Sequence, residues 1–290
     1  MSTLTTLART RLPRLARTRP AGHGHTPRRV GAIIAAAILL LAIAWALVPQ
    51  LFTTHDPNSG TFAPLLSPNS ENWFGTDSVG RDLYTRVVWG ARESLAGALV
   101  AVLVGLVVGT LIGLFAGTQA TQRAWIDSAL MRLVDVLLSI PALLLSLSVI
   151  ILLGFGTMNA ALAVGVTSVA TFARLARSQV LSVAAADFVE AAYGSGGTRT
   201  QVLFRHILPN SLTPVLALAA LQFGSAILQL STLGFLGYGA PPPTPEWGLI
   251  IADARDYMAT SWWLTVLPGV VIVAVVCAAN YLSHTIRKES

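Results

Sequence analysis

Charged side chains are scarce in this sequence of 290 residues. Only 11% of the residues are charged, whereas 54% are hydrophobic. A soluble domain typically carries about 25% charged residues, so this chain lacks the polar surface that a water-facing globule needs. Its apolar residues are gathered in runs of about 20, the length of a membrane-spanning helix. The composition therefore excludes an ordinary soluble domain and predicts an all-α polytopic membrane protein.

Lysine and cysteine are almost absent. The only lysine is Lys288, and no Gly-x-x-x-x-Gly-Lys-Ser/Thr string occurs, so these residues carry no P-loop. The only cysteine, Cys277, excludes an internal disulfide. The five histidines are scattered, and His23 with His25 resembles a metal pair only superficially. We therefore predict no metal site and no catalytic residues.

The basic residues are concentrated at the start of the chain. Seven of the nineteen lie in the first 29 positions, before the first apolar run. A basic segment in this place is more often an orientation signal than a nucleic-acid site. We predict that residues 1–29 form a solvated, disordered cytoplasmic tail and that the protein binds no nucleic acid.

Charge-free stretches predict six membrane-spanning helices within a single domain, residues 30–290. The stretch from Val136 to Ala173 holds 38 residues and would be about 57 Å long as one helix, nearly twice the hydrocarbon core. It must fold back near Gly154, and Pro141 is expected to kink the span before that turn. The predicted spans cover residues 30–51, 94–117, 134–153, 158–180, 209–233 and 263–285.

The distribution of arginine and lysine predicts the orientation in the membrane. With both termini in the cytoplasm, fifteen basic residues lie inside and four lie outside. Inner loops carry the excess of positive charge in membrane proteins, so both termini are expected to be cytoplasmic.

Two features inside the spans concern packing and mechanism. Gly105, Gly109, Gly113 and Gly117 share one helix face, a stripe that allows another backbone to approach closely. No ionisable residue is expected deep in spans one, two, four, five or six, which disfavours an ion-coupled carrier. Asp127 and Asp135 are interpreted as groups at the cytoplasmic end of span three.

The loop between spans four and five, residues 186–208, is the most informative segment. Its string Asp-Phe-Val-Glu-Ala-Ala-Tyr-Gly, from Asp187, predicts a short helix that ends at glycine. Two small alanines leave a surface that another protein can approach, and Gly196 and Gly197 permit a turn with positive φ. A second amphipathic stretch follows, and Pro209 is expected to open the next span.

This loop resembles the EAA loop of ABC importer permeases, which couples the permease to its ATPase. The matching residues are Glu190, Ala191, Ala192, Gly196, Leu208 and Pro209. One position departs from the pattern, because His206 stands where the family usually has isoleucine, with Ile207 beside it. Glu190 is expected either to pair locally or to form a salt bridge with the ATPase.

Two external segments resemble those of dipeptide and oligopeptide permeases, and match the "C" member of the permease pair. One runs from Trp73 to Leu95 and the other from Leu236 to Gly248. In the first, Asp77, Arg81 and Asp82 are expected to pair locally as a fold clamp rather than to contact substrate. Gly75 and Gly80 are expected to shape turns.

The resemblance implies the type I ABC importer permease fold in a bacterial cytoplasmic membrane. It also implies a homologous permease subunit as partner, two ATP-binding subunits that hold ATP and magnesium, an extracytoplasmic solute-binding protein and membrane lipid. The chain itself is then neither an enzyme nor a cofactor-binding protein. The expected solute is a dipeptide or oligopeptide, with nickel chelates, glutathione or haem as alternatives. An ion-coupled secondary carrier and a membrane-bound enzyme are the alternatives of other classes.

The orientation can be tested with single cysteines in a Cys277→Ala background. A cysteine at Ser195 should react with a membrane-impermeant thiol reagent only from the cytoplasmic side, and one at Thr244 only from outside, because of the distribution of basic residues. Labelling of position 195 from outside would refute the predicted topology.

Overall fold

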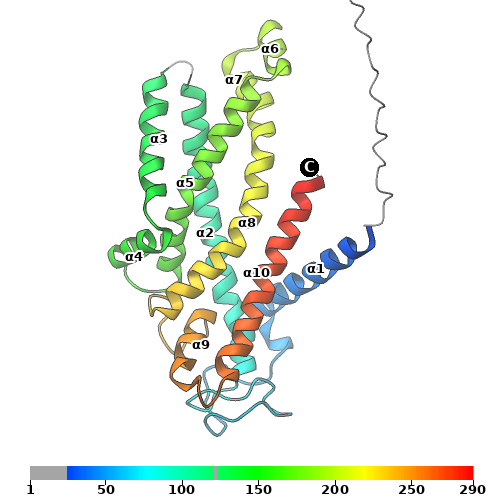
Figure 1. Cartoon of the computed structure of the whole chain (residues 1–290), viewed down its shortest axis with the longest axis vertical. Helices are drawn as coiled ribbons and strands as arrows, with labels where there is room; N and C mark the ends of the chain where they lie inside the picture. Colours follow the sequence, from blue (N-terminus) through cyan, green and yellow to red (C-terminus); the bar gives the residue numbers. More distant parts are fainter. Residues whose placement is uncertain (1–24, 121–122, 290) are drawn as a thin grey trace, which may run out of the picture.

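The protein is a bundle of long helices with short helices at both ends (Figure 1). A computed structural model describes residues 25–120 and 123–289. Within these ranges there is no β-strand, and a single isolated bridge joins Thr76 and Asp82. The loop of residues 52–82 and helix α9 lie at one end of the bundle, and α6 and α7 lie at the other. We call these the loop end and the α6 end.

The helices follow the predicted order. They are α1 (His25–Leu47), η1 (Pro49–Leu51), α2 (Leu83–Gln119), α3 (Ala124–Ser139), α4 (Ala142–Leu153), α5 (Thr157–Ala184), α6 (Asp187–Gly194), α7 (Arg199–Val202), η2 (Leu203–Ile207), α8 (Leu208–Phe235), α9 (Trp247–Ala254), η3 (Arg255–Tyr257) and α10 (Trp263–Glu289). Five are long and apolar enough to cross a membrane, and the bent pair of α3 and α4 together has the length and composition of a sixth span. The all-α, six-span prediction is confirmed.

The first two boundaries differ from the prediction. Helix α1 already begins at His25, so the last residues of the predicted tail are helical, and residues 1–24 lie outside the described part of the chain. Pro27 falls in the first turn. Backbone N–H groups there have no partner within the helix, so the missing N–H of proline costs no hydrogen bond. Helix α2 begins at Leu83 rather than at residue 94, and Asp82 caps it by accepting a hydrogen bond from the Thr85 N–H at 2.8 Å. The prediction from charge-free stretches missed this start of α2, because the charged residue Arg86 lies inside the helix.

The third span departs most from the prediction. It begins at Ala124, not near residue 134, and α3 and α4 meet at an angle of 98°. Pro141 causes this break: it cannot donate to the preceding turn, and it holds Ile140 in an extended conformation (ψ 129°). After α4 the chain contacts the segment that follows α8, where Phe155 packs on Tyr238 with ring centroids 5.5 Å apart.

One ionisable residue of α3 is also placed differently from the prediction. Arg174 and Arg177 lie within α5, which contains the predicted span 158–180 and continues to Ala184. Asp127 is in the first turn of α3, as expected, but Asp135 lies near its far end. Both aspartates pair with arginines of α5, Asp127 with Arg177 and Asp135 with Arg174.

The tightest helix pair is α2 with α5, which run in the same direction. The four predicted glycines line the contact, against Ser168, Phe172, Ala173, Ala176 and Val180 of α5. A β-carbon on Gly109 would lie 2.5 Å from the Val169 carbonyl oxygen, and one on Gly113 would lie 2.3 Å from that of Ala173. Because these obstacles are backbone atoms, no side chain can move aside to make room. The predicted close approach is confirmed, and α8 then packs against both helices and α10.

A Gly109→Ala variant tests this contact. The added methyl group should force α2 and α5 apart and lower the free energy of unfolding by about 1–3 kcal/mol, the usual cost of overpacking. Thermal unfolding of the detergent-solubilised protein measures the loss. Gly269→Ala is the matched control, because a β-carbon there meets no atom within 4 Å. Equal unfolding temperatures for both variants would contradict the proposed role of the glycines.

Candidate functional site

The segment between α5 and α8 folds as a helical hairpin. Helix α6 carries Asp187 and Glu190 in its first turn, where negative charge suits the helix dipole. The chain then turns at Gly196, whose φ of 86° is costly for any residue with a β-carbon. Gly197 does not have positive φ, contrary to expectation, but its N–H donates to the Ala192 carbonyl at 3.1 Å. A β-carbon on Gly197 would lie 2.7 Å from that oxygen, so the close approach itself requires glycine.

The second arm of the hairpin continues into the next span without a break. Thr198 and Gln201 form a capping box at the start of α7. Residues Leu203–Ile207 then form one π-helical turn, in which the Leu208 N–H donates to the Leu203 carbonyl, five residues back. The wider turn accommodates Pro209, which would otherwise clash with the preceding turn. Pro209 lies in the first turn of α8, as predicted, but α8 also continues the second arm without a break.

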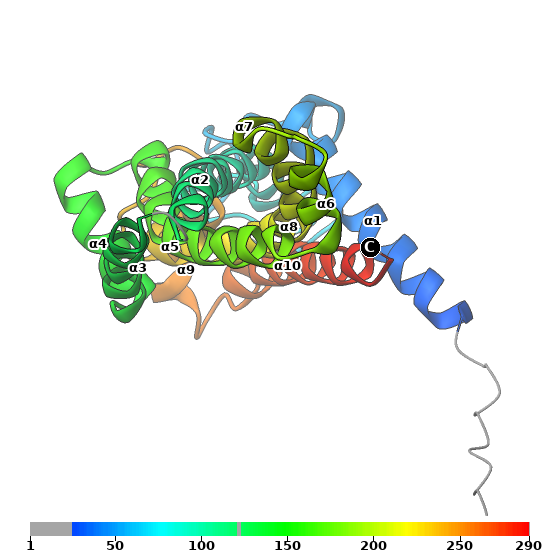
Figure 2. The same cartoon turned by 90° about the horizontal axis from the view of Figure 1, so that it is seen from above.

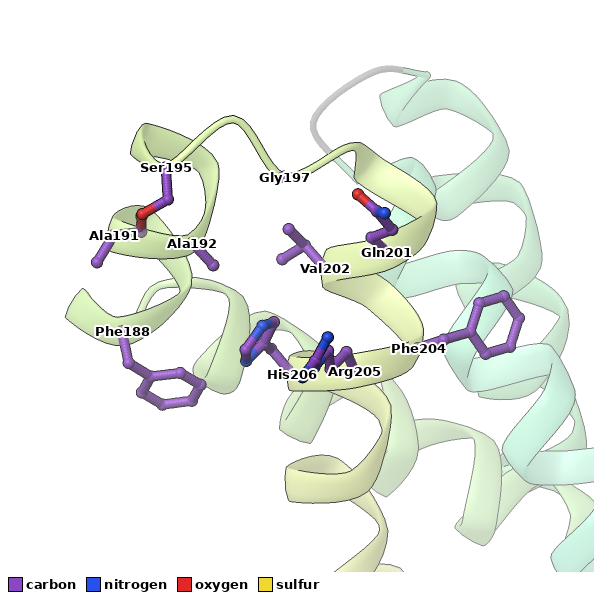
Figure 3. A pocket seen from close by; sticks show the side chains of 10 residues that line it. All are labelled: Phe188, Ala191, Ala192, Ser195, Gly197, Gln201, Val202, Phe204, Arg205 and His206. Atoms are coloured by element: carbon purple, nitrogen blue, oxygen red, sulfur yellow. The ribbon is translucent and has the colours of Figure 1, made fainter.

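The two arms enclose an open groove of about 770 Å³ (Figure 3). In the close-up, Ala192 points toward Val202 across the groove, while Phe204 points away from it. The lining residues are Phe188, Ala191, Ala192, Ser195, Gly197, Gln201, Val202, Phe204, Arg205 and His206. The groove thus combines small and aromatic side chains with two basic residues at its base.

The predicted EAA residues have different environments. Glu190 and Ala191 are exposed, and Glu190 makes no side-chain hydrogen bond or ion pair with any described residue. Ala192 is half-buried and packs on the small cluster of Val180, Val189, Val202 and Ile207. Leu208 and Pro209 belong to α8 and do not line the groove.

Sequence reasoning missed several groove residues. Phe188 and Arg205 lie in the loop of residues 186–208 but were not singled out, and His206 was noted only as a departure from the family pattern. Their signal was their position on both sides of the glycine turn, since a hairpin brings such positions together.

The predicted external motif forms a compact clamp at the loop end. Asp77 accepts a hydrogen bond from Arg81 Nε at 2.6 Å and also from the Val79 and Arg81 N–H groups. Asp82 caps α2 and accepts from Asn72 Nδ2 at 3.0 Å. Gly75 and Gly80 both have positive φ, 78° and 79°. The structure thus places all five residues in local contacts of the fold.

A buried arginine that the sequence reasoning missed joins this clamp to the other external loop. Arg86 is 1% exposed, and its Nη1 donates to the carbonyls of Pro57 at 3.1 Å and Pro243 at 3.2 Å. Its Nε lies 3.6 Å from an Asp77 carboxylate oxygen. Arg86 was assigned to an external loop, and only the early start of α2 brings it into the interior.

A second missed residue is Glu246, the N-cap of α9. Its carboxylate accepts from the Gly248 N–H at 2.8 Å, the Leu249 N–H at 2.9 Å and the Ser94 hydroxyl at 3.4 Å. Burial raises the pKa of Glu246, although these three hydrogen bonds oppose the rise. The signal in the sequence for this N-cap was a Glu directly before Trp-Gly-Leu. Among residues 25–120 and 123–289, no group of His, Cys, Asp and Glu has the geometry of a metal site.

Comparison with known proteins gives one matching family. The family described as "Binding-protein-dependent transport system inner membrane component" matches residues 109–288. The dipeptide transport system permease protein DppC of Alkalihalophilus pseudofirmus is 39% identical, over 89% of this chain and 83% of the relative. The probable D,D-dipeptide transport system permease protein DdpC of Escherichia coli is 38% identical, over 88% and 85%.

A relative named for a different solute and a solved structure also match this chain. The glutathione transport system permease protein GsiD of Pectobacterium atrosepticum is 36% identical, over 88% of this chain and 85% of the relative. Among solved structures, an inward-facing form of the MetNI methionine ABC transporter matches with a TM-score of 0.60 and 20% identity. That match covers 72% of this chain and 98% of the other. At this identity the structural match shows the fold alone.

Glu246 gives a pH-dependent prediction. Because its pKa is raised in the folded protein, the protonated form is the better fit, and its stabilising contribution is lost as pH rises through the folded-state pKa. Glu246→Gln imitates the protonated form at every pH. We expect the unfolding temperature of the variant, relative to the unmodified protein, to increase from acid to neutral pH. A constant difference across this range would contradict the raised pKa.

Proposed function

Because this chain belongs to the family of binding-protein-dependent transport inner membrane components, and is therefore a permease subunit of an ABC importer, we propose that it forms half of a path for peptides across the bacterial cytoplasmic membrane. The other half is a homologous permease. Two cytosolic ATP-binding subunits, with their ATP and magnesium, drive the cycle, and an extracytoplasmic binding protein delivers the solute. Both termini of this chain lie in the cytoplasm.

The names of the relatives support a short peptide as solute. Two relatives at 39% and 38% identity carry dipeptide names over more than four fifths of each chain. The glutathione relative at 36% identity also handles a small molecule built from amide bonds. Dipeptides and oligopeptides are the solutes this proposal names, and glutathione is the closest alternative.

The shape of the helical hairpin, residues 187–207, supports its role as the element that seats on the ATPase. Its tip projects from the α6 end of the bundle (Figure 1), and it exposes Glu190 and Ala191. Glu190 has no partner among the described residues, which favours a salt bridge to the ATPase over local pairing. A short helix that presents small side chains can enter a groove of another protein closely.

The continuity of the second arm with α8 supports a mechanical role. A force on α6 reaches α7 through the Gly197–Ala192 hydrogen bond and the contacts around Val202. From α7 it passes through η2 into α8, with no flexible joint between them. ATP-driven closure of the two ATPases can therefore move a membrane-spanning helix directly. The single observation that carries this proposal is this unbroken path from the exposed α6 surface to α8.

The coupling role can be tested with Ala191→Arg. A long charged side chain on the exposed face of α6 should block seating of the ATPase, whereas insertion of the permease and pairing with its homologue should persist. Co-purification of the ATPases with the tagged permease should fall severalfold or more, and peptide uptake by cells should be lost.

Two matched variants sharpen the result. Thr200→Arg places the same side chain on an exposed position of α7 that does not line the groove, and should retain docking and uptake. Ala192→Arg should disturb the hairpin itself, because Ala192 packs on its cluster, so its loss of docking should come with a lower unfolding temperature. Normal docking and normal uptake by Ala191→Arg would show that this loop is not the coupling element.

A further inference from the structure

Four polar residues of α3 lie on one face of the helix. Spacings of four, three and four residues place them along one line, and every one of them is exposed. They are Ser128, Arg132, Asp135 and Ser139. A different face of the same helix exposes Leu133, as expected for contact with lipid. Helix α3 therefore carries a line of exposed polar residues, with exposed apolar residues on another face.

Helix α5 repeats the pattern beside α3. Four of its polar residues have the same spacing and are exposed or half-buried: Thr167, Thr171, Arg174 and Ser178. The two helices are antiparallel neighbours at the edge of the bundle opposite α1 (Figure 2). A hydrogen-bonded ion pair between Arg174 and Asp135 joins the two lines of residues. We call these eight residues the polar wall.

The two ion pairs between α3 and α5 differ sharply in exposure. Arg177 holds Asp127 with two hydrogen bonds of 2.5 and 2.6 Å, and the Asp127 side chain is only 9% exposed. That pair closes the contact between the helices. The side chains of Arg174 and Asp135 are 56% and 60% exposed, so this pair faces out of the protein.

The exposed pair lies well inside the membrane-spanning helices. Arg174 precedes the end of α5 at Ala184 by about 15 Å, at 1.5 Å per residue. Asp135 lies about 17 Å beyond the start of α3 at Ala124. Thr167 and Ser139 are deeper still, and both helices belong to spans. Lipid cannot cover this face, because charged side chains in the hydrocarbon are costly and face water or protein instead.

We propose that the polar wall lines the water-filled inner part of the solute path, and that Arg132 is the positive charge on it that meets the carboxylate of the solute. The wall carries two arginines against one aspartate, and Arg132 has no ion-pair partner among the described residues. Peptides end in a carboxylate, so a free arginine can attract them without recognising their side chains. The identity of the solute in this inference depends on the proposed function, whereas the presence of water at the wall does not.

Water fits this face better than a second protein. A protein interface would have to remove the water from Arg132, Asp135 and Arg174 together, and desolvation of charges is costly unless each gains new partners. Serine and threonine, which fill the other five positions, suit water and weak passing contacts. A partner that covers the wall is nevertheless a distinct outcome of the test below.

Single cysteines in a Cys277→Ala background test whether water reaches the wall. In the assembled importer, reconstituted in vesicles, Ser139→Cys and Thr171→Cys should react with a charged methanethiosulfonate reagent supplied on the α6 side. Leu133→Cys is the matched control on the lipid face and should remain unreactive. Equal reactivity of the wall and control cysteines would overturn the inference. Wall cysteines that react only after the permeases are separated would show a protein interface, and would overturn it as well.

The role of Arg132 has a separate readout. Uptake of dialanine by Arg132→Gln should have a rate about fivefold lower, the expected effect of one charge interaction in a wet site. Arg132→Lys should restore it, and co-purification of the ATPases should be unchanged in both. Normal uptake by Arg132→Gln would refute the role of this arginine. Failure of the unmodified importer to take up dialanine or any other short peptide would refute the proposed solute, while the cysteine pattern would still decide whether the wall is wet.

Discussion

The close packing of α2 against α5 is the contact on which the rest of the structure depends. Hydrophobic burial does not bring helices together in lipid, so backbone proximity and van der Waals contact have to hold them. The glycine stripe supplies that proximity along most of both helices. Carbonyl oxygens of α5 lie in the space that side chains of α2 would fill if these residues were not glycine. At the loop end α2 carries Arg86, and at the α6 end α5 leads into the hairpin. One contact therefore fixes both functional ends of the molecule relative to each other.

Charged residues divide the molecule into fixed and accessible regions. At the loop end, Arg86 and Glu246 are buried. Arg86 donates hydrogen bonds to two different loops, and Glu246 accepts hydrogen bonds from α2 and α9. Buried polar groups of this kind are costly to leave without hydrogen-bond partners, so they hold these loops in place. On α3 and α5, the Asp127–Arg177 pair is largely enclosed, whereas the Asp135–Arg174 pair faces out of the protein.

The hairpin at the α6 end is joined to a membrane-spanning helix without a flexible joint, as the proposed coupling role requires. A loose loop would absorb a push from another protein, but here glycine-dependent contacts tie α6 to α7, and the π-helical turn joins α7 to α8. Pro209 follows this turn. The extra residue in the π-helical turn removes the clash that proline would otherwise cause, so the helical path stays continuous. Part of the polar wall lies on α5, the helix that enters this hairpin, so the proposed solute path and the proposed coupling element share a common support.

The sequence by itself determined the features that depend on local properties. Apolar length gave the number of spans, glycine at fixed spacing gave the close helix contact, and Gly196 gave the turn, because only glycine readily adopts positive φ. The motif strings gave the candidate residues of the coupling loop. Only the tertiary structure decided the inward position of Ala192, the burial of Arg86 and Glu246, and the different exposures of two similar ion pairs. Each of these depends on neighbours distant in sequence, since burial and pairing are set by what packs against a residue and not by the residue type.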